Sequence, residues 1–181
     1  DYYNIQPDLM SIAKGLSSGY LPIAAVMVAD HVSHVLIEEG GEFFHGMTYS
    51  GHPAACAVAC ANVRILRDEN IIDRVDTVTG PYLQERWNAL ADHPLVGESR
   101  GLGFLGALEL VEDKDTRKPY DPGREIGTLC REACLRLGLV LRAVGDTIII
   151  SPPLIMSEAE IDEMIAKVVQ GLDETFGSIT N

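Results

Sequence analysis

The sequence is poor in positive charge, in aromatic residues and in long apolar runs. Its 14 Lys and Arg residues face 27 Asp and Glu residues, which gives a formal net charge of −13 at pH 7. This excess of negative charge repels a nucleic-acid backbone and an anionic membrane surface, so neither is an expected partner. No stretch approaches the roughly 18 consecutive apolar residues of a membrane-spanning helix. Hydrophobic residues still make up 46% of the chain, which is typical of a globular protein and too high for a disordered one.

Cysteine is also scarce, and a secretory signal is not indicated. Residues 1–6 show no basic segment followed by an apolar one. The four cysteines form two pairs, Cys56/Cys60 and Cys130/Cys134, each spaced four apart inside a helical pattern. That spacing places both thiols of a pair on one helix face, where they could bind zinc. We favour the alternative, in which they are small buried hydrophobic residues and no metal is bound. A reducing, cytoplasmic location fits free thiols best.

The pattern of the chain changes near residue 77, which predicts two domains, 1–77 and 78–181. In the first, the apolar run 23–28 predicts a strand buried on both faces of a parallel sheet. Asp30 is a candidate cap for a short helix that ends before Gly40. Pro53 predicts the first turn of another helix, reaching about residue 67. Because this second helix is apolar nearly all round, we expect it to be deeply buried.

The second part shows regular amphipathic helices and short strands, so we expect an α+β unit in which helices cover a small sheet. Residues 104–111 predict a strand, and a helix from Ile126 should stop at Gly138, a typical C-terminal glycine. Two strands around Gly145-Asp146 predict a hairpin, with bounds 139–143 and 147–151. Ser157 and Glu160 predict a capping box. Apolar residues at helical spacing predict buried faces: Leu83, Trp87, Leu90, Cys130, Cys134, Leu137, Ile161, Met164, Ile165, Val168, Val169 and Leu172.

Lys14 is the first candidate for chemistry. It lies in SIAKGLSSG, among apolar and small residues, whereas a lysine on a solvated face usually has polar neighbours. Burial disfavours the ammonium form, and a neutral amine is what a Schiff base with a carbonyl compound requires. The alternative is a lysine whose stem is buried while its amine reaches water.

The loop 42–53 concentrates polar groups ahead of the Pro53 helix. It contains His45, Thr48 and His52 together with a Tyr, a Ser and two Gly residues. Hydroxyls and backbone N–H groups before a helix start favour a phosphate. A polar turn with a satisfied histidine is an equally good interpretation. The two histidines also suggest acid–base work, although a lone histidine is more often structural.

Arg142 interrupts an apolar strand and needs a partner for its charge. A planar guanidinium matches a carboxylate at two points. That carboxylate could belong to a substrate or to a structural acid such as Asp146, and the sequence slightly favours the structural acid.

Taken together, these segments resemble the class III aminotransferases. DLMSIAKG at residues 8–15 is similar to the family's cofactor-lysine motif, and HGMTYSGHP at 45–53 to its phosphate-contacting loop. LRAVGD at 141–146, followed by SPPL, resembles the arginine-bearing hairpin. The segment 100–110 resembles the entry strand of the family's small domain. The order and spacing agree along essentially the whole chain.

The resemblance implies an α/β protein of fold-type I. Residues 1–77 would be the end of the large, mainly parallel-sheet domain and 78–181 the small α+β domain. It implies pyridoxal 5'-phosphate as cofactor, held by Lys14 as a Schiff base, with Lys14 also shuttling protons. Thr48 would bind the cofactor phosphate of the neighbouring subunit in a homodimer. Arg142 would pair with the carboxylate of the keto acid. The expected reaction moves an amino group from an ω-amino acid, diamine or related amine to a keto acid, pyruvate being the expected acceptor.

Several family features are not found in this sequence. The aspartate for the pyridine nitrogen, the Gly/Ser phosphate turn and the stacking aromatic residue lie upstream of the lysine in the family. We therefore expect the natural protein to be longer and an isolated 181-residue chain to be nearly inactive. The alternatives are another class III reaction, of the ornithine, semialdehyde or diaminopelargonate type, and a non-catalytic module that keeps the fold.

Overall fold

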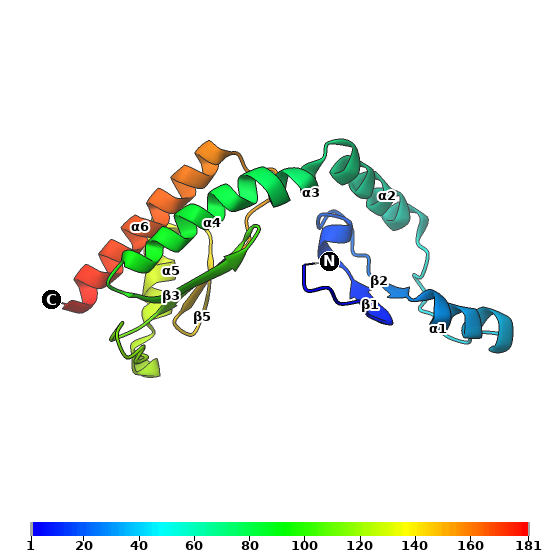
Figure 1. Ribbon diagram of the computed structural model, residues 1–181, viewed down its shortest axis with the longest axis horizontal. Helices are drawn as coiled ribbons and strands as arrows, with labels where there is room; N and C mark the ends of the chain where they lie inside the picture. Colours follow the sequence, from blue (N-terminus) through cyan, green and yellow to red (C-terminus); the bar gives the residue numbers. More distant parts are fainter. Residues whose placement is uncertain (1, 181) are drawn as a thin grey trace. The chain divides into compact units, whose positions relative to one another are not determined.

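The computed structural model describes residues 2–180, which form two compact units, one ending at Asn70 and the other beginning at Ile71 (Figure 1). The division falls slightly before the change of pattern near residue 77. The assignment of residues 1–77 and 78–181 to two enzyme domains stays a prediction. Within residues 2–180, no helix combines the length and the apolarity that a membrane crossing requires.

The N-terminal unit is a strand pair followed by helices. Strand β1 (Leu9–Ile12) pairs antiparallel with β2 (Ala25–Val28), and a short 3-10 helix, η1 (Lys14–Leu16), follows β1 directly. Helix α1 (Asp30–His34) continues into the π-helical turn η2 (Val35–Glu39), and the chain breaks at Gly40 as predicted. Helix α2 (Pro53–Asp68) has Pro53 in its first turn, which confirms that prediction.

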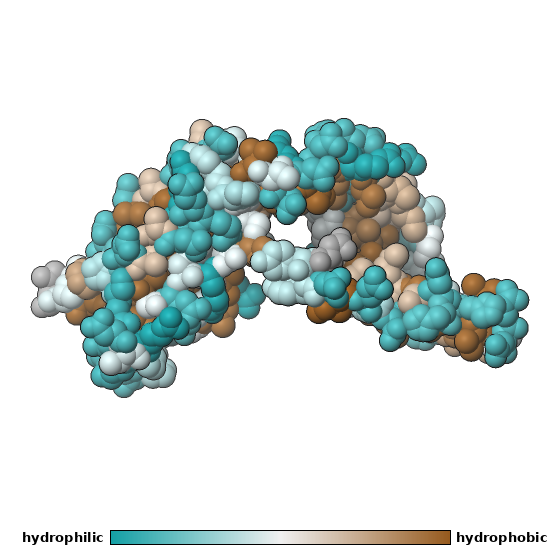
Figure 2. All heavy atoms as spheres, viewed as in Figure 1, coloured by the Kyte–Doolittle hydropathy of each residue, from teal (hydrophilic) through white to brown (hydrophobic). Residues whose placement is uncertain are grey.

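Three expectations for this unit are wrong. All four residues of β2 are exposed and its partner is antiparallel, so it is not a strand buried in a parallel sheet. Helix α2 buries only Ala55 and Ala59, and Cys60 is exposed. Ala29, not Asp30, occupies the cap position of α1, without a side-chain hydrogen bond. Figure 2 shows hydrophobic residues at the surface of this unit. The apolar pattern of both elements therefore exceeds what residues 2–70 can cover.

The C-terminal unit is a four-stranded antiparallel sheet with helices packed on one face. The strand order is β3-β4-β6-β5. Residues of β4 alternate between buried and exposed, with Leu108 and Leu110 buried and Glu109 between them exposed, so one face of the sheet is open. The elements are α3 (Ile71–Arg74), η3 (Val75–Thr79), α4 (Gly80–Ala89), η4 (Leu90–Asp92), β3 (Val96–Leu102), β4 (Leu105–Leu110), η5 (Pro122–Arg124), α5 (Ile126–Arg136), β5 (Arg142–Val144), β6 (Thr147–Ile150) and α6 (Glu158–Thr180).

The core of this unit lies between the sheet and α4, α5 and α6. Burying one Leu or Phe side chain stabilises a fold by about 1.5–3 kcal/mol, so this cluster dominates the stability of the unit. The predicted stripes are confirmed, apart from Leu137, Ile165 and Val169, which are only partly covered or exposed. The members with no exposed surface include Leu83, Trp87, Leu95, Leu108, Cys130, Cys134, Ile148, Ile161, Val168 and Leu172.

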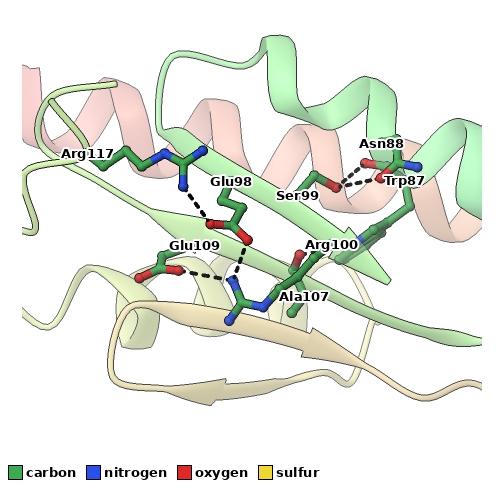
Figure 3. Close-up of polar contacts among 8 residues, drawn as sticks. All are labelled: Trp87, Asn88, Glu98, Ser99, Arg100, Ala107, Glu109 and Arg117. Carbon is green, nitrogen blue, oxygen red and sulfur yellow. Dashed lines mark hydrogen bonds and ion pairs between the residues drawn. The ribbon is translucent and has the colours of Figure 1, made fainter. Parts of the chain in front are cut away.

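Polar contacts fix how α4 sits on the sheet. Trp87 donates from its indole Nε1 to the carbonyl of Ala107 at 3.4 Å, and Ser99 donates to the carbonyl of Trp87 at 3.1 Å (Figure 3). On the open face, Arg100 forms ion pairs with Glu98 and Glu109. These exposed pairs contribute little to stability, so the buried Trp87 contacts define the register of helix and sheet.

Local signals in this unit confirm several predictions. The Ser157 hydroxyl accepts from the Glu160 amide at 3.3 Å, and the Glu160 carboxylate accepts from the Ser157 amide at 2.7 Å, which is the predicted capping box. Helix α5 ends before Gly138, whose φ is +79°. Strands β5 and β6 pair around Gly145, at φ +55°. Glycine accommodates such left-handed backbone without the clash that a Cβ would cause.

Candidate active site

Lys14 stands at the junction between β1 and η1. Its backbone has a φ of +50°, which is unusual for a residue with a side chain. The side chain is exposed, and its amine forms no hydrogen bond or ion pair with any residue between 2 and 180. The expectation of an apolar, covered lysine is therefore wrong within residues 2–180, which leave the side chain of Lys14 exposed. The amine is free to react with a ligand.

Lys14 lines an open depression of about 580 Å³. Sites for small molecules commonly have volumes of about 300–1,000 Å³. Strands β1 and β2 form one wall, and the loop before α2 forms the other. The structure thus brings together two segments that the sequence singled out separately, the lysine motif and the loop 45–53. Besides Lys14, the polar residues of the lining are Ser11, His45 and Ser50.

The loop is held by turns of its own. The Met47 amide donates to the Ser50 hydroxyl at 3.0 Å, and the Ser50 amide donates to the Met47 carbonyl at 2.9 Å. Thr48 lies between them, is exposed, and is not among the residues that line the depression. Its hydroxyl has no hydrogen bond within the described part of the chain. Thr48 is therefore available to a group outside this depression.

The two histidines of the loop differ in environment. The Nδ1 atom of His52 accepts from the Ala55 amide at 3.4 Å, so His52 is the N-cap of α2 and its role is structural. His45 lines the depression instead, with its ring 5.7 Å from the ring of Phe43. Acid–base work is thus open to His45, while the structural interpretation holds for His52.

One residue near the lysine was missed from the sequence. Asn62 of α2 forms hydrogen bonds to Gly15, Leu16 and Ser18, the residues that follow Lys14. A signal was present, because Asn62 is an amide in a helix otherwise built from small and apolar residues up to that point. Asparagine is a poor helix former, and its presence in a helix interior indicates a specific contact.

Arg142 belongs to the C-terminal unit, on β5. Its side chain is exposed and forms no ion pair or hydrogen bond with any residue in the described range 2–180. The slightly favoured pairing of Arg142 with Asp146 is wrong. The Asp146 carboxylate accepts a hydrogen bond from the Gly127 amide at 2.8 Å and so caps the N-terminus of α5. Arg142 and mainly apolar residues line a second depression of about 490 Å³. An exposed guanidinium at the rim of an apolar depression can receive a carboxylate.

The cysteines of α5 are part of the hydrophobic core. Cys130 and Cys134 have no exposed surface. The hydrogen bond to Cys134, together with burial, raises the pKa of the Cys130 thiol far above its ordinary value. A protonated, buried thiol behaves as a small hydrophobic group. No group of three or more metal-binding side chains is assembled among residues 2–180.

Comparison with known proteins supplies the context for this geometry. The family model described as "Aminotransferase class-III" matches residues 1–172. Putrescine–pyruvate aminotransferase of Pseudomonas aeruginosa is 57% identical over 179 residues, which cover 98% of this chain and 39% of that protein. Gamma aminobutyrate transaminase 3 of Solanum lycopersicum is 44% identical over 176 residues, which cover 96% of this chain and 34% of that protein.

A solved structure agrees with these relatives. The chain superposes on the aminotransferase of Vibrio fluvialis in its PMP-bound form with a TM-score of 0.91 and 35% identity. The match covers 97% of this chain and 39% of the Vibrio chain. The chain thus spans well under half the length of each of these proteins.

Proposed function

The chain belongs to the class-III aminotransferases, and from this membership we propose that Lys14 is the catalytic lysine of a pyridoxal-phosphate-dependent transaminase. The similarity to solved transaminases also confirms the predicted fold, that of part of a fold-type I transferase. One observation carries the proposal. The Lys14 amine, which has no partner among residues 2–180, opens on the depression that the loop 45–50 completes.

The residues around this depression fit the cofactor. A depression of about 580 Å³ admits a pyridine ring and a phosphate. Lys14 would hold the cofactor covalently, and Ser50 and the backbone of the loop would face it. When bound, pyridoxal phosphate supplies an aldehyde and an electron sink.

Lys14 would then act as the proton carrier. The Nζ amine would take a proton from the amine-bearing carbon of the substrate, and the ammonium group so formed would give that proton to the aldehyde carbon of the cofactor in the same half-reaction. The side chain has no ion pair among residues 2–180 that would hold it in one position. This freedom of the Lys14 side chain to move supports its role in carrying a proton from one carbon atom to another.

We propose two further site residues. Thr48 would bind the cofactor phosphate of a second subunit in a homodimer, a role supported by its exposed hydroxyl and its position outside the lining around Lys14. Arg142 would bind the carboxylate of the keto acid, since its guanidinium has no partner among the described residues.

For the substrates, we propose a diamine or ω-amino acid as donor and pyruvate as acceptor. The support is the 57% identity to an enzyme named for putrescine and pyruvate. The 44% identity to a gamma aminobutyrate transaminase favours an ω-amino acid as the second candidate donor. A panel of putrescine and gamma-aminobutyrate against pyruvate and 2-oxoglutarate separates these cases. A cytoplasmic location, and the exclusion of nucleic acid and membrane as partners, stay predictions from composition.

The test is Lys14→Ala in the enzyme that contains this chain. Loss of the amine should abolish the visible absorption of the cofactor–lysine linkage and lower kcat by about 10²–10⁴-fold, the usual contribution of general acid–base catalysis, or more. Lys167→Ala is the control, because Lys167 forms an ion pair with Glu163 on the surface of α6. Retained absorption and turnover in the Lys14 variant would refute the assignment of Lys14 as the catalytic lysine.

A further inference from the structure

The turn that presents Lys14 has an unfavourable backbone. Lys14 and Ser18 both have positive φ, +50° and +49°, although each has a Cβ. Such residues persist where surrounding contacts enforce them, and they concentrate at functional sites. The contacts of residues 14–18 therefore enforce this backbone.

Asn62 supplies most of the side-chain contacts to this turn. Its Nδ2 group donates to the carbonyl oxygens of Gly15 at 2.8 Å and Leu16 at 3.2 Å. Its Oδ1 atom accepts from the Ser18 hydroxyl at 2.6 Å. Ser17, buried to all but 2%, adds a hydrogen bond of its own to the Leu21 carbonyl at 2.6 Å. One amide from a distant part of the sequence therefore uses both its donor and acceptor ends on the lysine turn.

Helix α2 links this support to the loop on the other side of the depression. The helix begins at Pro53, directly after the loop, and His52 caps it. Asn62 lies further along the same helix. One helix therefore contacts the lysine turn through Asn62 and continues directly from the loop 45–52.

We propose that Asn62 is a positioning residue, which holds η1 so that the Lys14 amine faces the depression. This inference rests on the proposed function of Lys14. The chemistry requires asparagine, because the two carbonyls need an N–H donor while the Ser18 hydroxyl needs an acceptor. Aspartate would keep the acceptor and place a negative charge against two carbonyl oxygens.

Three variants of the enzyme that contains this chain separate the contacts. Asn62→Asp removes both donors, and Ser18→Ala removes only the hydroxyl that reaches Oδ1. Arg64→Ala is the matched control, since Arg64 lies on the same helix, is exposed, and has no side-chain hydrogen bond or ion pair within residues 2–180. Small displacements of a catalytic group can cost about 10²-fold in rate. We expect Asn62→Asp to lower kcat about 10–100-fold with a nearly unchanged KM for the amine, Ser18→Ala to act weakly, and Arg64→Ala not at all.

A second measurement uses the cofactor-free protein. The amides of Leu16, Ser17 and Ser18 donate within the turn, to Ala13, Lys14 and Gly15. In Asn62→Asp, their hydrogen exchange should accelerate at least about tenfold while the amides of α2 keep their protection. If Asn62→Asp does not give soluble protein, Asn62→Ala removes the same donors without adding a charge.

The outcomes distinguish the two proposals. Unchanged exchange in the turn, or equal loss of protection throughout α2, overturns the role of Asn62 whatever Lys14 does. Accelerated exchange with kcat unchanged overturns it too, because the turn would then not position a catalytic group. Full activity of Lys14→Ala overturns the proposed function and leaves the exchange result to be judged by itself.

Discussion

Gly127→Ala should destabilise the C-terminal unit through a backbone clash. A Cβ at position 127 would lie 2.1 Å from the carbonyl oxygen of Gly145 and 2.9 Å from Cα of Asp146. Both neighbours are backbone atoms, so the β5–β6 turn would have to withdraw by about 1 Å to restore an ordinary contact. The turn is not free to do so, because the Asp146 carbonyl also accepts from the Leu110 amide at 2.9 Å.

The size of the effect follows from two losses and one gain. Overpacking a filled site costs about 1–3 kcal/mol. Loss of the 2.8 Å hydrogen bond from the Gly127 amide to Asp146 removes a helix cap, at about 0.5–2 kcal/mol. Replacing glycine by alanine in a helix returns at most about 1 kcal/mol. Since the two losses outweigh the gain, we expect the free energy of unfolding to fall by about 0.5–5 kcal/mol.

Urea unfolding of the 181-residue chain measures this change. Trp87 is the single tryptophan and is fully buried in the C-terminal unit, so its fluorescence reports on the relevant core. Gly177→Ala is the control, because a Cβ at that helical position meets nothing within 4 Å. An unfolding midpoint for Gly127→Ala equal to or above that of Gly177→Ala would refute the reasoning.

Two further predictions concern the same unit. Burial lowers the pKa of His93, and its Nδ1 accepts from the Leu95 amide at 3.1 Å while Nε2 lies 3.4 Å from Asp173. The folded state thus binds fewer protons than the unfolded state, so the free energy of unfolding should decline as pH falls through about 6.5. Urea midpoints measured across that pH range should decline more steeply for the unsubstituted chain than for His93→Gln. Gly171→Ala should lower the free energy of unfolding by about 1–3 kcal/mol, because the added Cβ would clash with the Cys134 sulfur. In a double-mutant cycle, combining it with Cys134→Ala should recover most of that loss.

Features set by nearby residues could be predicted from the sequence. The Ser157–Glu160 capping box and the end of α5 at Gly138 each depend on a few adjacent positions. The buried stripe of α4 follows from helical spacing alone. These predictions succeeded because local geometry leaves few alternatives.

Features that depend on distant partners could not be predicted. Strand β1 is not predicted from the sequence. The predicted burial of β2 is wrong, because the apolar pattern of 23–28 does not reveal which residues cover that strand. The sequence slightly favours a structural acid such as Asp146 over a substrate as the partner of Arg142, whereas the Asp146 carboxylate accepts a hydrogen bond from the N-terminus of α5 instead. In the candidate site, Lys14 and the loop were found by their residue types. Asn62 was missed because its contacts span more than forty residues of chain.

Because the Arg142 guanidinium has no partner among residues 2–180, the folding of its hairpin does not depend on the side chain that is proposed to select the acceptor. The turn after β5 is anchored by Asp146, and β5 pairs with β6 through backbone groups, so the fold does not draw on the guanidinium. Substitution of Arg142 to suit a different acceptor should therefore not lower the stability of the hairpin. A substitution at this position would leave in place the contacts of Asp146 that hold the turn.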